Sequence, residues 1–253
     1  MIAELETSLD AVLGGRLKLR QPLKGHRVGH DAILLAAATA ARAGEHAVEF
    51  GAGVGAAGLA LAARVPGLRV TLIEIDAALA ALAAENAKIN ALDDRVGSIA
   101  GNVEDVQTFA GLGVGSIDRV LMNAPFHDVE RIQPSPDPRR RLAYAGDKDL
   151  LARWVESARH LLKPGGALTL IWRADAADEV MAALKAGFGA VATLRVKARD
   201  GSPAVRILVR ALKNGHGATV DHDTLILYGP EHRPTAAAEA VLRGGETLSL
   251  ARL

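Results

Sequence analysis

The feature that most constrains how this chain folds is a regular alternation between short apolar runs and alanine-rich stretches. Five apolar runs have the length of strands, at 46–50, 69–75, 95–101, 117–123 and 167–172. The stretches between them have the length and composition of helices. Strands that alternate with helices form a parallel sheet with helices on both faces. We therefore expect an α/β fold, a doubly wound and mostly parallel sheet of seven strands with a C-terminal antiparallel hairpin.

Helix and turn signals place the remaining elements. Asp76 stands where an N-cap belongs and opens a long helix over 77–90. The turn Asp200-Gly201 separates the apolar runs 191–198 and 204–213, a pattern that predicts the antiparallel hairpin. Further helices are expected at 30–41, 56–64, 150–162 and 178–186.

The chain has 253 residues, of which 49% are hydrophobic, so it can bury one large core. We expect a single domain over 1–253, with a basic N-terminal segment and helix at 1–45, a core at 46–215 and a C-terminal extension at 216–253. The chain has no cysteine, and its eight histidines show no paired metal spacing, so we expect no metal. The acidic N-terminus lacks the apolar region of a secretory signal, and 33–41 is too short to span a bilayer. We therefore expect a cytoplasmic protein without a membrane partner.

A glycine-rich loop joins the first apolar run to the next helix. Gly51, Gly53 and Gly55 lie where small residues let the backbone approach a ligand closely. Gly53, Gly55 and Gly58 also satisfy the G-x-G-x-x-G fingerprint of dinucleotide sites, and Glu74 follows at about the spacing of its ribose-binding acid. The loop alone is compatible with either NAD or S-adenosylmethionine.

Two carboxylates favour S-adenosylmethionine. Glu49 ends the first strand, where it can meet the positive amino group of a methionine moiety and would repel a dinucleotide pyrophosphate. Glu74 ends the second strand and can accept hydrogen bonds from ribose hydroxyls with either cofactor. We therefore expect S-adenosylmethionine as the cofactor.

These patterns carry a resemblance to a known family. V-E-F-G-A-G-V-G, followed by an acidic strand end, resembles motifs I and II of class I S-adenosylmethionine-dependent methyltransferases, which have a Rossmann-like fold. N-A-P-F after the strand at 117–123 is similar to their [D/N]-P-P-[Y/F/W] motif, which is carried by enzymes that methylate planar exocyclic or amide nitrogens. The sequence departs from that motif at Ala124, where the family has proline.

The chemistry of nitrogen methylation gives each residue of N-A-P-F a role that the resemblance implies. An exocyclic amine is a poor nucleophile because its lone pair is delocalised into the ring. Asn123 would accept one N–H through its side-chain oxygen, and the Ala124 carbonyl would accept the other. Pro125 would fix the local backbone, and Phe126 would stack on the base. Catalysis would then rest on positioning and electrostatics.

The segment before the glycine loop is similar to one in bacterial tRNA(Val) adenine-N6 methyltransferases. Its pattern there, [K/R]-x-G-x-D-x-[I/V]-L-L, is matched by Arg27, Gly29, Asp31, Ile33, Leu34 and Leu35. The resemblance covers most of residues 20–175. It implies that Asp31 lies near the methionine end of the cofactor, with a role as helix N-cap as the alternative. It also implies that Asn102 lies at the cofactor adenine, where this class often has an aspartate.

The implied substrate is the N6 of adenine in RNA, above all tRNA. Arg139, Arg140 and Arg141, in a proline-rich segment expected to form a long loop, would contact phosphates together with the basic N-terminus. The alternatives are glutamine-N5 methylation of a protein, and adenine methylation of ribosomal RNA or DNA. A cofactor-binding module without catalysis and an NAD-dependent oxidoreductase are the alternatives from other classes. Release-factor methyltransferases have a sizeable helical domain before motif I, and only 1–45 precede it here, which argues against the glutamine reaction.

Overall fold

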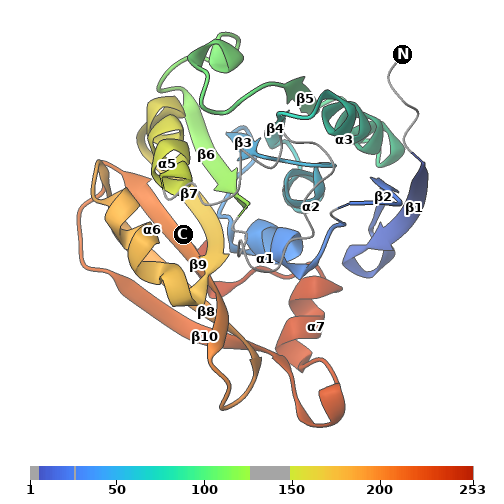
Figure 1. The fold of residues 1–253 in the computed structure, drawn as a ribbon, viewed down its shortest axis with the longest axis vertical. Helices are drawn as coiled ribbons and strands as arrows, with labels where there is room; N and C mark the ends of the chain where they lie inside the picture. The colour runs from blue at the N-terminus through green and yellow to red at the C-terminus, as the bar shows by residue number, and fades with distance from the viewer. Residues whose placement is uncertain (1–5, 26, 126–148, 253) are drawn as a thin grey trace.

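The computed structural model describes residues 6–25, 27–125 and 149–252, and its centre is an eight-stranded sheet (Figure 1). The strands lie in the order β10-β8-β9-β7-β6-β3-β4-β5. Their bounds are β3 (His46–Phe50), β4 (Arg69–Glu74), β5 (Val96–Ala100), β6 (Ile117–Met122), β7 (Leu162–Arg173), β8 (Phe188–Arg199), β9 (Ala204–Lys213) and β10 (Val220–Tyr228). All neighbours pair in parallel except β9, which is antiparallel to both β7 and β8.

The α/β fold and the antiparallel hairpin are confirmed, and the sheet is mostly parallel and Rossmann-like as expected. The expected seven strands are β3 to β9. The count was one too low, because β10 adds an eighth strand in parallel to β8. Within β10 only Leu225 and Leu227 are buried, and its first half is polar. An exposed edge strand of this kind has a weak apolar pattern.

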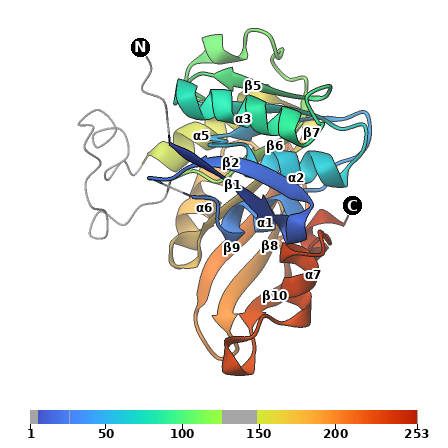
Figure 2. The ribbon, with the colours of Figure 1, turned by 90° about the vertical axis from the view of Figure 1, so that its right-hand side faces the viewer.

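Helices cover both faces of the sheet (Figure 2). The helices are α1 (His30–Ala38), α2 (Ala56–Arg64), α3 (Ala77–Ile89), α5 (Leu150–Leu161), α6 (Ala177–Leu184) and α7 (Ala236–Leu242). One apolar cluster unites α1, α2, α3 and α7 on one face, and a second unites α5 and α6 on the other. The predicted cap is confirmed, since Asp76 Oδ1 accepts the N–H of Ala78 at 2.9 Å. Helix α1 ends at Ala38, earlier than the 30–41 predicted.

A two-stranded hairpin, β1 (Thr7–Val12) and β2 (Leu17–Pro22), precedes α1 and was not expected from the sequence. Two asparagines attach it to α3. Asn86 accepts the N–H of Arg20 at 2.7 Å and donates to its carbonyl at 3.0 Å, and Asn90 makes the same two bonds with Lys18 at 2.9 and 2.8 Å. Asn86 and Asn90 are four residues apart on the helix, a rise of about 6 Å, and Lys18 and Arg20, two residues apart on the strand, are separated by a similar distance. The two amides therefore lie opposite alternate residues of β2.

Asn86 also reaches the glycine-rich loop. Its side chain is fully buried, and Nδ2 donates to the Val54 carbonyl at 3.0 Å in addition to the bonds with β2. This one side chain therefore connects the N-terminal hairpin, α3 and the loop after β3.

We predict that Asn86→Ala lowers the free energy of unfolding by about 2–4 kcal/mol, because it leaves buried backbone groups of Arg20 and Val54 without partners. Asn90→Ala removes the same two bonds to β2 at a half-buried position and should cost only about 1 kcal/mol. Urea unfolding of the two variants measures the difference. Equal losses of stability would show that the burial of Asn86 and its bond to Val54 add nothing.

Candidate active site

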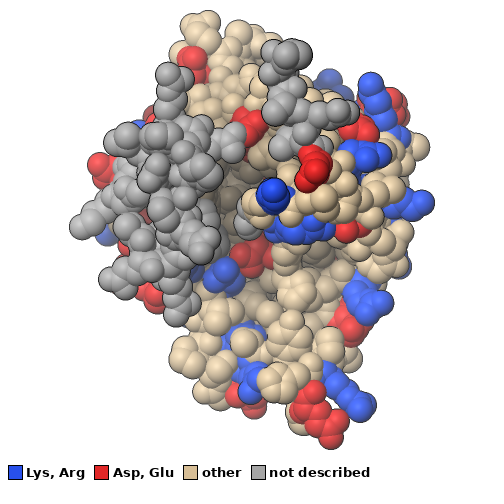
Figure 3. All heavy atoms as spheres, turned by 45° about the vertical axis from the view of Figure 1, so that its right-hand side comes forward, with Lys and Arg blue, Asp and Glu red and all other residues tan. Residues whose placement is uncertain are grey.

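Three loops of interest meet at one edge of the sheet because β3 lies between β4 and β6. Phe50, the last residue of β3, pairs with Ile73 on β4 and with Met122 on β6. Parallel neighbours end at the same edge, so the glycine-rich loop, Glu74 and Asn123 follow adjacent strand ends. The sequence predicted this grouping. On the face drawn in Figure 3 the surface is hollowed near its centre, where acidic and basic side chains both lie.

The glycines of the loop differ in what surrounds them. A Cβ on Gly51 would lie 2.7 Å from the Trp154 ring, so this position is glycine because α5 packs against it. A Cβ on Gly53 would meet nothing within 4 Å, and its φ of 55° is left-handed. Open space at Gly53 is therefore where a ligand can approach the backbone of this loop. Trp154 had no sequence signal, because its contacts with Gly51 and Phe50 are long-range.

Glu74 fixes the shape of the glycine loop. Its carboxylate accepts the N–H of Gly53 at 2.8 Å through Oε2 and the N–H of Asp76 at 2.9 Å through Oε1. The side chain is buried. The residue expected to bind ribose hydroxyls thus also bridges the loop after β3 and the start of α3. Each carboxylate oxygen can accept further hydrogen bonds from a ligand.

Glu49 is buried rather than solvated, with 4% of its surface exposed. Its Oε2 accepts the N–H of Gly58 at 2.6 Å, in the first turns of α2. Burial raises the pKa of this carboxyl to about 8, the hydrogen bond from Gly58 opposes the shift, and the charge of Glu74 adds to it. A cation bound beside a buried carboxyl group stabilises its ionised form. This position therefore favours a positively charged ligand.

Asn123 follows β6 and is half-buried, and its side chain has no hydrogen-bond partner among the described residues. Its amide is therefore available to a ligand. Ala124 is 1% exposed and belongs to the apolar cluster under α5. Pro125 is half-buried, and Phe126 lies outside the described residues.

Two other predicted positions make contacts within the chain, and one alternative role is wrong. Asp31 does not cap α1, whose N-cap is Gly29, but accepts a hydrogen bond from Arg206 Nε at 2.8 Å. This ion pair joins α1 to β9, a contact between residues far apart in the sequence. Asn102 is exposed and accepts the N–H of Glu104 at 3.0 Å in a local turn. Arg139, Arg140 and Arg141 lie outside the described residues.

In 6–25, 27–125 and 149–252, no group of three or more His, Cys, Asp or Glu side chains is arranged to hold a metal ion. Within the same ranges, no helix has both the length and the apolar character needed to cross a membrane.

Comparison with known proteins agrees with the geometry. The family model of the methyltransferase small domain matches residues 26–199. The chain is 33% identical over 153 residues to the tRNA1(Val) (adenine(37)-N6)-methyltransferase of Porphyromonas gingivalis, covering 59% of each protein. It is also 33% identical over 161 residues to the release factor glutamine methyltransferase of Bifidobacterium longum, covering 58% of this chain and 54% of that one. The matches thus span less than two thirds of the length of these relatives.

Among solved structures, the chain resembles that of a predicted O-methyltransferase from Agrobacterium tumefaciens. The TM-score is 0.72 and the sequence identity is 28%, over 86% of this chain and 98% of that one. This likeness covers a larger share of the chain than residues 26–199.

The pKa of Glu49 makes stability depend on pH in a defined window. Its value rises from 4.5 to about 8 on folding, so the folded chain holds a proton that the unfolded chain releases. This group therefore lowers the free energy of unfolding as pH rises from about 4.5 to 8, by at most about 1.4 kcal/mol per pH unit.

We predict that Glu49→Gln removes this contribution, because the amide oxygen still accepts from Gly58 and carries no charge. Urea unfolding at pH 5, 6.5 and 8 should show the variant gaining stability relative to the wild type as pH rises. Glu179→Gln, an exposed position on α6, is the matched control and should follow the wild type. Identical pH dependence for all three proteins would contradict the raised pKa.

Proposed function

The chain belongs to the methyltransferase small domain family, and from this premise we propose that it transfers a methyl group from S-adenosylmethionine to the N6 of adenine in RNA, above all tRNA. The observation that carries the proposal is the amide of Asn123 beside the glycine-rich loop, at adjacent ends of β6 and β3. An N–H acceptor next to a cofactor loop is what methylation of a planar nitrogen needs.

The surroundings of the glycine loop fit the cofactor. S-adenosylmethionine supplies an electrophilic methyl group on a positively charged sulfur, and its methionine end carries an ammonium group. Gly53 offers open space at the backbone, and Glu74 offers carboxylate oxygens for the ribose hydroxyls. Glu49 supplies a buried carboxyl whose ionised form a bound cation would stabilise. Asp31 and Asn102 would lie at the methionine and adenine ends.

Asn123 and Ala124 would hold the amino group of the base. The Asn123 side-chain oxygen accepts one N–H, and the Ala124 carbonyl accepts the other. S-adenosylmethionine would supply the methyl group, and the two acceptors would hold the amine with its lone pair directed at that methyl group. The extra proton on nitrogen then leaves to water. Both acceptors stabilise the positive charge that develops on nitrogen during the attack.

The replacement of proline by alanine in the N-A-P-F motif fits this role. The family proline restrains the backbone that presents the carbonyl, whereas here burial does so. The Ala124 methyl group is 1% exposed and packs in the apolar cluster under α5. Its carbonyl can therefore keep a fixed direction, and we propose an active enzyme rather than a cofactor-binding module. Phe126 would stack on the base.

The choice of RNA rests on the relatives and on the segment before the glycine loop. The Porphyromonas gingivalis relative is named for adenine-N6 methylation of a valine tRNA, and the Bifidobacterium longum relative for glutamine methylation of release factors. An amide and an aminopurine present the same planar N–H group to Asn123. We favour adenine because Arg27, Gly29 and Asp31 match the tRNA enzymes, and Arg139, Arg140 and Arg141 would contact phosphates.

We predict that Asn123→Ala lowers kcat/KM for methyl transfer to undermodified tRNA by roughly 100-fold to 1,000-fold. The affinity for S-adenosylhomocysteine should change little, because Asn123 would act on the amine. Transfer of labelled methyl groups measures kcat/KM, and calorimetric titration measures the affinity for S-adenosylhomocysteine. Asn214→Gly is the control, since Asn214 lies beyond β9 at the opposite sheet edge and its φ of 55° suits glycine.

Unchanged transfer to tRNA by Asn123→Ala would contradict the assigned role. Label that enters a glutamine-containing release factor and not tRNA would move the proposal to the glutamine reaction.

A further inference from the structure

The sheet extends well past the candidate active site at its C-terminal side. Arg173, the last residue of β7, pairs with Arg206 on β9, which pairs in turn with Val196 on β8. Strand β8 continues from there to Arg199. We call the region formed by the end of β8, the end of β10 and the turn η4 (Pro230–His232) the distal end.

The distal end lies at the same edge of the sheet as Asn123. Strand β9 is antiparallel to β7 and β8, so β8 and β10 run in the direction of β6 and β7. Their carboxyl ends therefore point the same way. From the strand spacing and the register, Arg199 lies on the order of 20 Å from Asn123. This distance corresponds to a few nucleotides of an extended RNA strand.

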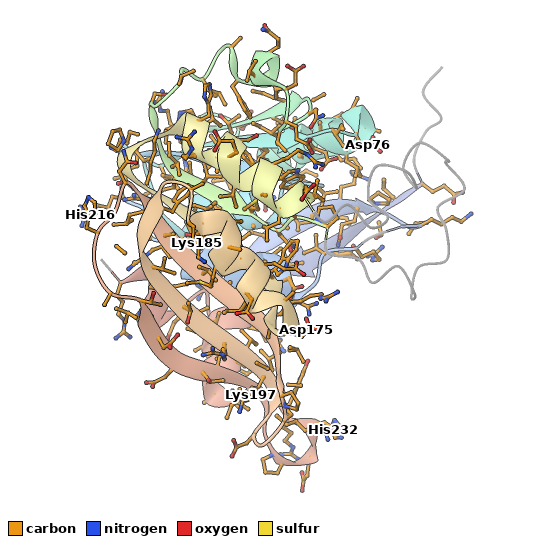
Figure 4. All side chains as sticks on the ribbon, turned by 60° about the vertical axis from the view of Figure 1, so that its left-hand side comes forward. Asp76, Asp175, Lys185, Lys197, His216 and His232 are labelled. Atoms are coloured by element: carbon orange, nitrogen blue, oxygen red, sulfur yellow. The ribbon has the colours of Figure 1, made fainter. Side chains whose placement is uncertain are left out.

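Two cations without an acidic partner among the described residues, Lys197 and Arg199, lie at the distal end together with His232. Arg199 Nη2 lies 2.6 and 2.7 Å from the two ring nitrogens of His232. Among the described residues, neither Arg199 nor Lys197 is within ion-pair distance of a carboxylate. Figure 4 shows Lys197 and His232 toward the lower end of the molecule, apart from Lys185 and His216.

Two acidic residues, Asp200 and Glu231, are the sequence neighbours of Arg199 and His232. Asp200 accepts the N–H of Gly201 at 3.0 Å, and Glu231 lies 3.4 Å from Arg233, whose side chain is 82% exposed. Within the described residues, neither carboxylate forms an ion pair with Lys197 or Arg199, so these two side chains are the ones that can meet an anion.

The turn that carries His232 has an unusual backbone. Glu231 and His232 have φ of 57° and 59°, a left-handed conformation that costs free energy in residues other than glycine. Flanking hydrogen bonds hold the turn, with Gly229 N–H donating to the Arg233 carbonyl at 2.8 Å. The imidazole is thus held against Arg199 rather than left free in solvent.

We infer that the distal end binds phosphates of the RNA strand that flanks the target base, through Lys197, Arg199 and His232. The inference rests on the proposed function, because it needs a polyanion bound at Asn123. An arginine guanidinium binds phosphate through two parallel N–H groups, and lysine and histidine add further donors. His232, which lies beyond the residues matched by the family model, then contributes to RNA binding together with the end of β8.

The test compares two triple variants in tRNA binding by fluorescence anisotropy over a range of salt concentrations. The first, Lys197→Ala with Arg199→Ala and His232→Ala, removes the distal cations. The second, Lys185→Ala with Arg42→Ala and His216→Ala, removes the same kinds of groups from exposed positions at the opposite edge. Thermal unfolding checks that both variants are folded.

We expect the distal variant to raise Kd for tRNA by about 10-fold and to reduce the slope of log K against log salt by about 1–2, since each phosphate contact contributes 0.7–0.9. The opposite-edge variant should match the wild type. A distal variant with wild-type Kd and slope, in a protein that still methylates tRNA, would overturn this inference and leave the proposed function intact. A wild-type protein that neither binds nor methylates tRNA would overturn both.

Discussion

The parallel pairing of β3 with β4 on one side and β6 on the other is the constraint on which the rest of the site depends. The register sets Phe50 opposite both Ile73 and Met122, so the three strands end at one level. The segments that follow must then leave the sheet side by side. A glycine loop, an acidic strand end and an asparagine become neighbours although 21 to 70 or so residues separate them in the sequence. A shift of one residue in either pairing would turn Glu49 and Glu74 toward the wrong face.

The carboxyl groups at these strand ends determine which ligands the site can bind. Glu49 and Glu74 end neighbouring strands, and each accepts hydrogen bonds from backbone N–H groups, Glu49 from Gly58 and Glu74 from Gly53. Burial, with a smaller contribution from the charge of Glu74, raises the pKa of Glu49 to about 8. A cationic cofactor would offset both effects and favour the ionised form. The carboxyl groups that shape the loop would thus also contribute to cofactor affinity. Binding of the cofactor would release a proton from Glu49 near neutral pH.

Local signals in the sequence were sufficient for much of this structure. The strands β3, β4, β6 and β7 are apolar runs, and the cap at Asp76 is a local hydrogen bond, so both were predicted correctly. The hairpin β1-β2 was missed because only Leu17 and Leu19 alternate with polar residues in a short segment. That alternation of buried leucines was the signal that could have revealed β2.

Contacts between distant residues could not be predicted from one sequence. In the sequence, nothing distinguishes Asn86 from other helix residues, yet its side chain forms hydrogen bonds with β2 and with Val54. The ion pair of Asp31 with Arg206, 175 positions further along the chain, likewise had no signal in the sequence. Such pairs depend on how elements pack, and composition and periodicity carry no information on that.

The most direct test of the account is to identify the methylated nucleoside. Undermodified total tRNA would be incubated with the protein and isotope-labelled S-adenosylmethionine, digested to nucleosides and resolved by mass spectrometry. The account predicts that the label appears as N6-methyladenosine. Label in another nucleoside, or none in tRNA although the protein binds S-adenosylhomocysteine, would contradict it.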